Sequence, residues 1–523
     1  MNAVDELPPG SDVTLADRCA HWASVSPDAP CLTSGDTTKS WAAVMERCRR
    51  LAAGLASSGR GARIIYLGRN STVFIELAIA SSMAGTVITA VNWRLAAPEM
   101  AEVVEHSTAE LAFVEHEFAE RWAEASSSQM STVFFGGDGR DDYEHWLAEH
   151  QPTAPQGRAA PDDIALQMYT SGTTGLPKGA LFSHAALKGV DLSASAMGVT
   201  ADSTMLVVIP LFHAGGAGAA MIALRAGAHL VISADTSADA LATAVERYAV
   251  TSMMLVPTLL NELLSRPTAM ARDLSSLRMI SYCGSPITPT LLAQCIDGFK
   301  CGLVQLYGLT EVNGISVLRA EDHLDTEHPE RLRSVGRELP GVVMRILDPL
   351  TGADVIPGET GEICVKAPTA MSGYFRAPDR TAEAFTSDGF LRTGDGGYLR
   401  DGYLYLRDRI KDMVITGGEN VYPVEVEKVL VACPGVADVA VIGVPSERWG
   451  ETLKAFVVLT EDGASTSEAV VEFARLHLAG YKCPTSVEIV SALPRNASGK
   501  LLKRVVREQA WIDAHRVHSP STA

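Results

Sequence analysis

The stretch from Met168 to Gly179 holds the residue types best suited to chemistry in this sequence. It reads Met-Tyr-Thr-Ser-Gly-Thr-Thr-Gly-Leu-Pro-Lys-Gly and begins where an apolar run ends. Glycines let backbone N–H groups approach a polyphosphate, while hydroxyls and a lysine supply further donors and charge. Pro177 stands where the P-loop of NTPases has its second glycine, so that motif is excluded. We interpret the stretch as a phosphate-binding loop, with a Gly/Ser/Thr-rich surface loop as the alternative. The candidate ligand-binding residues are Thr170, Ser171, Gly172, Thr173, Thr174 and Lys178.

A second informative stretch, Gln-Leu-Tyr-Gly-Leu-Thr-Glu, occupies residues 305–311. Tyr307 offers an aromatic face for a base, and Gly308 permits close approach of the backbone. Thr310 offers a hydroxyl for a phosphate, and Glu311 offers a carboxylate for Mg²⁺. Each of these residues alone could be an ordinary core or solvated residue. Only their combination indicates a nucleotide site.

Several other candidates are weak by themselves. Gly284 and Ser285 follow a short expected strand, where small residues leave room for a ligand, although an ordinary βα turn would look the same. Asp395, in Arg-Thr-Gly-Asp, can accept two hydrogen bonds from ribose hydroxyls or can be a turn residue. Lys500 is by default a solvated lysine beside a glycine. His213 follows Pro-Leu-Phe, and a histidine in such a place is more often structural than catalytic.

Composition limits the classes of function that fit. The chain has 523 residues, enough for about three domains or subdomains. Its formal net charge of −18 disfavours non-specific binding to nucleic acid or anionic lipid. Nine cysteines without a C-x-x-C pair argue against a disulfide framework or a zinc site. The acidic N-terminus lacks a signal peptide, so a cytoplasmic location is expected. The apolar run 74–93 contains Glu76, which favours a buried helix and strand over a transmembrane segment.

Helices and short strands alternate along the first 280 residues or so, which predicts βαβ units, a parallel sheet and an α/β fold. The polar stretch 126–163 is expected to be a surface connection. The expected helices span residues 15–24, 41–57, 73–84, 184–197, 238–248 and 259–265, and the expected strands span 63–66, 86–91, 111–114, 229–233, 252–256 and 279–281.

The pattern changes near residue 336. Short strands and glycine-rich turns over 336–407 predict a small β-barrel-like subdomain, which completes a domain of residues 1–407. The charged segment 408–412 is expected to be a hinge. Residues 408–510 are expected to form a small α+β domain, and 511–523 a frayed tail. The expected elements of the small α+β domain are helices 424–430 and 467–479 and strands 436–444, 454–460 and 487–490.

Five stretches occur in an order that resembles the adenylate-forming (AMP-binding) family, which includes acyl-CoA synthetases and aryl-CoA ligases. They span residues 170–179, 307–311, 392–395, 408–412 and 494–500. The resemblance implies a large N-terminal domain that carries the nucleotide and acyl sites. It also implies a small C-terminal domain that rotates over them.

The resemblance further implies a role for each candidate residue. Lys500 would reach the reacting carboxylate, Thr310 would contact phosphate, and Glu311 would assist Mg²⁺. Tyr307 and Gly284 would hold adenine, and His213 would act as a gate near the acyl and thiol tunnels. The remaining expected roles are ribose binding for Asp395 and Arg409, a hinge for Lys411, and a surface that faces the thiol for Gly417, Gly418 and Glu419.

The implied reaction uses ATP to convert a carboxylic acid into an acyl-adenylate and pyrophosphate. A thiolate then takes the acyl group and AMP leaves. Residues 417–423 and 481–484 resemble those of stand-alone acyl-CoA ligases, so CoA is the expected acceptor. The acid is expected to be a fatty, alicyclic or aromatic small molecule. An adenylating enzyme with another acceptor and a non-catalytic nucleotide-binding regulator remain as alternatives, and a homodimer is a candidate assembly.

Overall fold

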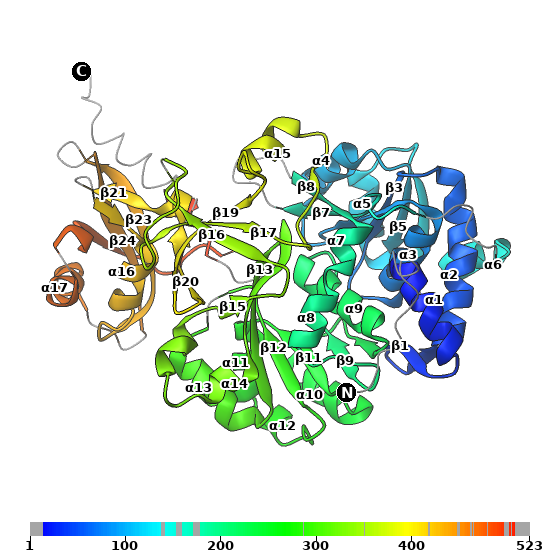
Figure 1. Cartoon of the computed structure of the whole chain (residues 1–523), viewed down its shortest axis with the longest axis horizontal. Coiled ribbons are helices and arrows are strands. Elements are labelled where there is room, and N and C mark those ends of the chain that lie inside the picture. The colour runs from blue at the N-terminus through cyan, green and yellow to red at the C-terminus, as the bar shows by residue number, and fades with distance from the viewer. Residues whose placement is uncertain are drawn as a thin grey trace. The chain divides into compact units, whose positions relative to one another are not determined.

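The computed structural model is shown in Figure 1. It describes residues 14–137, 142–152, 159–170, 178–285, 287–349, 351–416, 419–446, 450–460, 463, 465–478, 480–495, 501–503 and 505–507. The chain forms two compact units, one of Met1–Val343 with Val365–Leu391 and the other of Met344–Cys364 with Arg392–Ala523. Large sheets build the first unit, and smaller sheets build the second.

The first unit contains a seven-stranded sheet whose order is β18-β8-β7-β4-β3-β5-β6. The five strands β7, β4, β3, β5 and β6 are parallel to one another. β8 pairs antiparallel with β7, and β18 pairs antiparallel with β8. All five residues of β4 are buried, as expected for a strand covered on both faces. The strands span Gly373–Tyr374 (β18), Lys178–Ser183 (β8), Ile164–Thr170 (β7), Val87–Val91 (β4), Arg63–Leu67 (β3), Leu111–Glu115 (β5) and Ser131–Phe135 (β6).

A nine-stranded sheet completes this unit, with the order β15-β14-β13-β12-β11-β9-β10-β1-β2. Because β12 and β13 are parallel neighbours, their carboxyl ends meet at one edge, where ligands bind in open α/β sheets. The strands span Arg337–Glu338 (β15), Val312–Leu318 (β14), Gly302–Leu309 (β13), Met279–Tyr282 (β12), Ser252–Leu255 (β11), Thr204–Val207 (β9), His229–Ile232 (β10), Pro30–Ser34 (β1) and Thr37–Ser40 (β2). The predicted parallel α/β architecture is confirmed.

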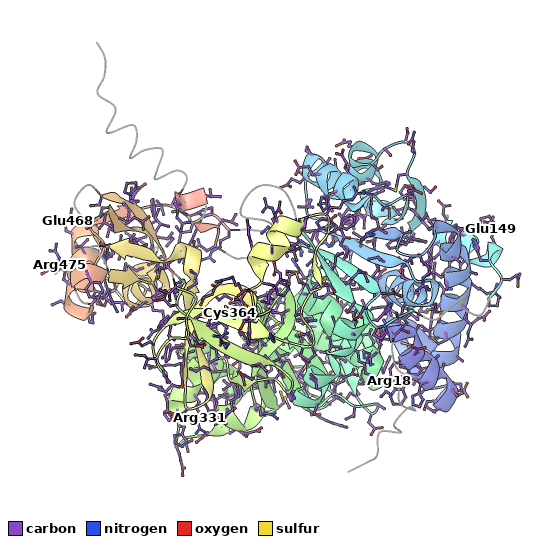
Figure 2. The ribbon with its side chains drawn as sticks, turned by 45° about the horizontal axis from the view of Figure 1, so that its top comes forward. Arg18, Glu149, Arg331, Cys364, Glu468 and Arg475 are labelled. Carbon is purple, nitrogen blue, oxygen red and sulfur yellow. The ribbon has the colours of Figure 1, made fainter. Side chains whose placement is uncertain are left out.

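Helices connect the strands, and several begin at a Ser or Thr whose hydroxyl accepts a backbone N–H. α1, α2 and α3 lie side by side (Figure 1). Arg18 on α1 (Figure 2) donates to the carbonyl oxygen of Arg225 on α9 at 2.8 Å. The helices span Leu15–Val25 (α1), Trp41–Leu55 (α2), Thr72–Ala84 (α3), Ala97–Ser107 (α4), Ala119–Ala125 (α5), Asp142–Glu149 (α6), Ala214–Ala226 (α9), Ala238–Tyr248 (α10), Pro257–Ser265 (α11), Pro267–Met270 (α12), Pro289–Phe299 (α13) and Ala320–Leu324 (α14).

The apolar run 74–93 forms α3 and β4, as predicted. Glu76 on α3 is fully buried and receives hydrogen bonds from Arg47 at 2.7 Å and from the Tyr143 hydroxyl at 2.5 Å. A buried carboxylate needs such partners, since water cannot solvate it. Among the described residues, no helix is long and apolar enough to cross a membrane.

Two predictions about local structure are wrong. The stretch 126–163 is not only a surface connection, because it contains β6 and α6, which bury Val133, Phe135, Tyr143 and Leu147. The expected helix 184–197 is two short helices, α7 (His184–Lys188) and α8 (Asp191–Ala196). Gly189 follows α7, and a Cβ there would lie 2.9 Å from Thr369 and 3.0 Å from the backbone of Pro368, so the close approach of this segment favours glycine.

The β-rich region 336–407 is present, but its strands are shared among three sheets. β16 (Val343–Leu347), β17 (Gly361–Lys366), β19 (Leu391–Arg400) and β20 (Tyr403–Arg409) form a four-stranded sheet. β15 and β18 join the two large sheets instead. Cys364 on β17 (Figure 2) is fully buried in this region.

The C-terminal part of the second unit is a five-stranded sheet with two helices. The two predicted helices and the three predicted strands are present, and β21 and β22 are additional strands. Its core includes Val426, Val441, Ala455 and Val470, all fully buried. The elements span Val414–Thr416 (β21), Glu419–Val421 (β22), Pro423–Leu430 (α16), Val436–Ser446 (β23), Gly450–Leu459 (β24), Ser467–His477 (α17) and Ser486–Ile489 (β25). Pro423 begins α16, the position where proline's missing N–H costs nothing.

All nine cysteines are free thiols. Seven are buried, and only Cys283 and Cys301 are half-buried. Burial raises the pKa of both of these thiols to about 11. Because the thiolate is the reactive form, these cysteines are protonated and unreactive at neutral pH.

Candidate functional site

The stretch 307–311 forms the turn of the β13–β14 hairpin, with Thr310 and Glu311 between the paired residues Leu309 and Val312. Gly308 permits this tight crossing. A Cβ at that position would lie 2.7 Å from the amide nitrogen of Gly314. Tyr307 is buried at 8% exposure. The hairpin therefore presents a hydroxyl and a carboxylate at the carboxyl end of a sheet strand, where ligands bind in open α/β sheets.

Tyr374 holds the Glu311 side chain, and it was not among the residues predicted from the sequence. Its hydroxyl donates to the Glu311 carboxylate at 2.8 Å, and the Met371 N–H donates to the Glu311 carbonyl at 2.8 Å. Burial, followed by the charge of Glu311, raises the pKa of Tyr374. The phenol thus stays protonated and remains a donor at physiological pH.

Lys178 shares this neighbourhood. It begins β8, opposite Thr170 at the end of β7, and its Nζ lies 5.1 Å from the centre of the Tyr374 ring. The structure thus brings the lysine of the first motif and the carboxylate of the second to the same tyrosine. Ser171, Gly172, Thr173 and Thr174, which were also predicted to bind phosphate, lie outside the described residues.

A chain of polar contacts supports the strand that leads into this loop. Arg63 donates to Gln167 at 3.2 Å, Gln167 donates to the Tyr169 hydroxyl at 2.9 Å, and that hydroxyl lies 2.8 Å from Nδ1 of His106. Burial, with a smaller effect from the charge of Arg376, lowers the pKa of His106. A neutral His106 therefore takes part in this chain at neutral pH, next to Thr170.

Gly284 and Ser285 follow β12, as predicted. Gly284 has φ +83°, a left-handed conformation that favours glycine, and a Cβ there would lie 3.5 Å from Val256. Cys283 donates its backbone N–H to the Leu255 carbonyl at 3.2 Å. The parallel pairing of β12 with β13 places this turn at the same sheet edge as the Thr310–Glu311 turn.

His213 precedes the first turn of α9 and keeps an exposed surface, although protein surrounds much of its ring. Its ring centre lies 4.4 Å from that of Phe212. Desolvation, followed by the positive charge of Arg94, lowers the pKa of His213 from 6.5 to about 4. His213 is therefore neutral at pH 7.

The pKa of His213 predicts a specific acid sensitivity. Below about pH 6.5 the unfolded chain binds a proton that the folded chain refuses until about pH 4. The contribution of His213 to stability is therefore lost as the pH falls from 6.5 to 4. We expect the unfolding temperature of wild type to fall more steeply over this range than that of His213→Phe, measured by calorimetry. Parallel curves for the two proteins would contradict the pKa assignment.

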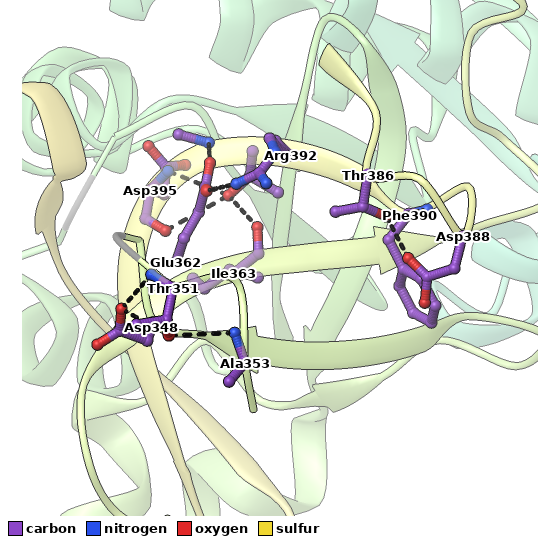
Figure 3. A network of polar contacts seen from close by, with 12 residues as sticks. Asp348, Thr351, Ala353, Glu362, Ile363, Thr386, Asp388, Phe390, Arg392 and Asp395 are labelled. Carbon is purple, nitrogen blue, oxygen red and sulfur yellow. Dashed lines mark hydrogen bonds and ion pairs between the residues drawn. The ribbon is translucent and has the colours of Figure 1, made fainter. Parts of the chain in front are cut away.

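In the second unit, Asp395 lies on β19 within a network of hydrogen bonds (Figure 3). Its backbone N–H donates to the Thr393 hydroxyl at 3.0 Å, and Arg392 donates to Glu362 at 2.6 Å. The backbone of Asp395 pairs with that of Arg409 across the β19–β20 ladder. The structure thus brings together the two positions predicted to bind ribose.

The remaining candidates are only partly described. Lys500, Gly417 and Gly418 lie outside the described residues. Lys411 is in a short 3-10 helix, Ile410–Asp412, and Glu419 begins β22. The description of Arg409, Lys411 and Glu419 is limited to their backbone.

Glu311 is the side chain in this site that suits a divalent cation. No cluster of three or more His, Cys, Asp or Glu residues that could hold a metal exists in the described part of the chain. Mg²⁺ usually keeps several waters and binds through one or two carboxylates together with substrate phosphates. One half-buried carboxylate that shares Tyr374 with Lys178, the last charged residue of the predicted phosphate-binding stretch, fits that mode of binding.

Comparisons with known proteins agree with this geometry. Residues 19–375 match the family described as AMP-binding enzyme, and residues 425–500 match the AMP-binding enzyme C-terminal domain. The chain is 34% identical to the fatty acid–[acyl-carrier-protein] ligase ScoC of Streptomyces coeruleorubidus, over 96% of this chain and 98% of that protein. It is 37% identical to a feruloyl-CoA synthase of Amycolatopsis sp, over 93% and 97%. The structure of ATP-bound MatB from Rhodopseudomonas palustris superposes with a TM-score of 0.86 at 29% identity, over 94% and 98%.

Proposed function

Since the chain belongs to the AMP-binding enzyme family, we propose that it activates a carboxylic acid with ATP and transfers the acyl group to CoA. A carboxylate resists nucleophiles because of its own charge, so it must first be activated. Its attack on the α-phosphate of ATP expels pyrophosphate and gives an acyl-adenylate. The CoA thiolate then attacks the acyl carbon, and AMP leaves.

The arrangement of Lys178, Tyr374 and Glu311 carries this proposal. Two anions must meet in the first step, so cations and N–H donors at fixed positions lower the barrier. Lys178 and the loop that precedes it bind the β and γ phosphates. Glu311 holds Mg²⁺, which neutralises phosphate charge when bound. Thr310, on the same turn, donates its hydroxyl to a phosphate oxygen.

Other predicted residues orient the nucleotide. Tyr307 and Gly284 hold adenine, and Asp395 with Arg409 holds the ribose. Lys500 neutralises the reacting carboxylate and the bridging oxygen. His213 gates the entry to the acyl site, and its neutral ring suits that role because it adds no charge near an apolar chain.

A rotation of residues 408–510 about Lys411 separates the two half-reactions. In the first state Lys500 reaches the carboxylate. In the second, Gly417, Gly418 and Glu419 face the adenylate and the thiol enters. Gating of this kind explains how one site serves two steps with different reactants.

A narrow cavity supports an apolar acyl group. It lies between β7, β8, α7, α9 and β14, and it is no larger than about one water molecule. Its walls include Met168, Phe182 and Met221, and its polar members are Thr369 and Asn313, which is two residues after Glu311. A Cβ at Gly218 would lie 2.2 Å from the Asn313 amide nitrogen. We propose that flexible methionines move aside here for a fatty or aromatic group and that Asn313 contacts its polar end.

The cavity yields a testable prediction. Ala217→Leu fills the α9 wall, so we expect kcat/KM for a long-chain or arylpropenoic acid to fall about tenfold relative to that for a short acid. The KM for ATP should not change, since the nucleotide does not touch this wall. Pyrophosphate release measured across an acid series would check the ratio. An equal decrease for every acid would contradict the proposed acyl site.

The overall proposal is tested by pyrophosphate release and thioester formation across a panel of fatty, alicyclic and aromatic acids with ATP and CoA. Acid-dependent pyrophosphate release with CoA thioester product is the expected result. One curated relative is named as a ligase of acyl carrier protein, so thioester on a carrier protein but none on CoA would establish that acceptor instead. ATP binding without turnover of any acid would favour the regulatory alternative.

A further inference from the structure

Tyr374 lies between two opposite charges that serve different ligands. The Lys178 ammonium lies over its ring at 5.1 Å from the centre, and the Glu311 carboxylate accepts from its hydroxyl at 2.8 Å. All three side chains are half-buried. Although Lys178 and Glu311 are both described, no ion pair joins them, and each meets the tyrosine instead.

A direct pair between these charges would impair the site. In a half-buried setting a lysine and a carboxylate attract each other more strongly than in water. Such a pair would neutralise the cation needed by phosphate and the carboxylate needed by the metal. ATP would then have to break the pair before it could bind.

The backbone around Tyr374 holds its ring in place. The Tyr374 N–H donates to the Thr381 hydroxyl at 2.9 Å, and the next N–H, of Phe375, donates to the Gly179 carbonyl at 2.7 Å. Arg63 lies over the Phe375 ring at 4.0 Å from its centre. In the pairing of β18 with β8, Tyr374 lies opposite Ala180, two residues after Lys178. The ring is thus fixed by the strand that carries the lysine.

We propose that Tyr374 is a positioning residue that insulates Lys178 from Glu311. Its ring keeps the ammonium in place by a cation–π contact, and its hydroxyl orients the carboxylate by a charge-assisted hydrogen bond. Both charges stay available, one for the β and γ phosphates and the other for the metal. This inference rests on the proposed function of the site.

The test is ATP binding without metal, measured by calorimetry in the presence of EDTA. Tyr374→Leu removes the ring, so Lys178 pairs with Glu311 and the Kd for ATP should rise about tenfold. Tyr374→Leu combined with Glu311→Gln should bind within about threefold of wild type, because glutamine cannot form the ion pair. Tyr374→Phe keeps the ring and should also bind nearly as wild type does. Rescue by a second substitution distinguishes insulation from simple loss of structure.

Tyr248→Phe is the matched control, since it removes a hydroxyl that donates to the backbone carbonyl of Gly35. It should leave ATP binding unchanged. Tyr374→Met takes the place of the leucine variant if the latter does not unfold cooperatively. The inference would be overturned if Tyr374→Leu, or Tyr374→Met in its place, bound ATP as tightly as wild type. It would also be overturned if adding Glu311→Gln to that variant did not restore ATP binding. Wild type that fails to bind ATP even when Mg²⁺ is supplied would instead overturn the proposed function.

Discussion

Lys500→Ala is expected to lower the rate of acyl-adenylate formation by about 10²–10³-fold. In the proposed mechanism, the Lys500 ammonium neutralises charge that builds up on the carboxylate and the bridging oxygen in the first half-reaction. The proposed rotation moves the same lysine away before the second half-reaction. Transfer of the acyl group from a supplied acyl-adenylate to CoA should therefore proceed at nearly the wild-type rate. Pyrophosphate release and thioester formation measure the two steps separately.

Lys503→Ala provides the control for this experiment. Lys503 is a near neighbour of Lys500, but its ammonium pairs with Glu427 at 3.0 Å. Its replacement should leave both half-reactions close to wild type. If Lys500→Ala forms adenylate as fast as wild type does, the assigned role of Lys500 is wrong. If both half-reactions slow equally, the rotation between two states is wrong.

Glu311→Gln is expected to lower pyrophosphate release about 100-fold at low Mg²⁺ concentration, with partial recovery as the concentration rises. Glutamine preserves the shape of the side chain and can still contact the Tyr374 hydroxyl, but it removes the charge that is proposed to hold the cation. Binding of Mn²⁺ to the enzyme–ATP complex, followed by electron paramagnetic resonance, should weaken in parallel.

The control is Glu321→Gln, which makes the same chemical exchange on helix α14, away from the β13–β14 turn. It should leave the Mg²⁺ dependence unchanged. Loss of activity in Glu311→Gln without any change in Mn²⁺ binding would mean that Glu311 acts on the substrate rather than on the metal.

The stretch 307–311 could be singled out from the sequence because its residue types are local. It was predicted to offer a hydroxyl and a carboxylate to a nucleotide, and the structure places Thr310 and Glu311 at the turn between β13 and β14. Tyr374 was missed because its role depends on pairing between β18 and β8, which are almost 200 residues apart in the chain. A Gly-Tyr pair in a short irregular stretch carries no local signal for such a contact.

Errors in the fold have a similar origin. β6 has only Val133 and Phe135 buried and lies in a polar stretch, so its apolar pattern was too short to stand out. The close approach of Gly189 to Pro368 and Thr369, which are distant in sequence, could not be read from the local pattern. Regular elements with long apolar patterns, such as α10, were predicted with their observed bounds, Ala238–Tyr248.

The buried or protonated state of all nine cysteines makes the chain a ready background for fluorescent labelling. Leu476 on α17 is 77% exposed, so Leu476→Cys would add one reactive thiol at neutral pH. A dye attached there, paired with a second at an equally exposed site in the first unit, such as Leu324 at 70% exposure, would report energy transfer between the units. Addition of ATP, acid and CoA in turn would then follow the proposed rotation in single molecules, without removal of any native cysteine.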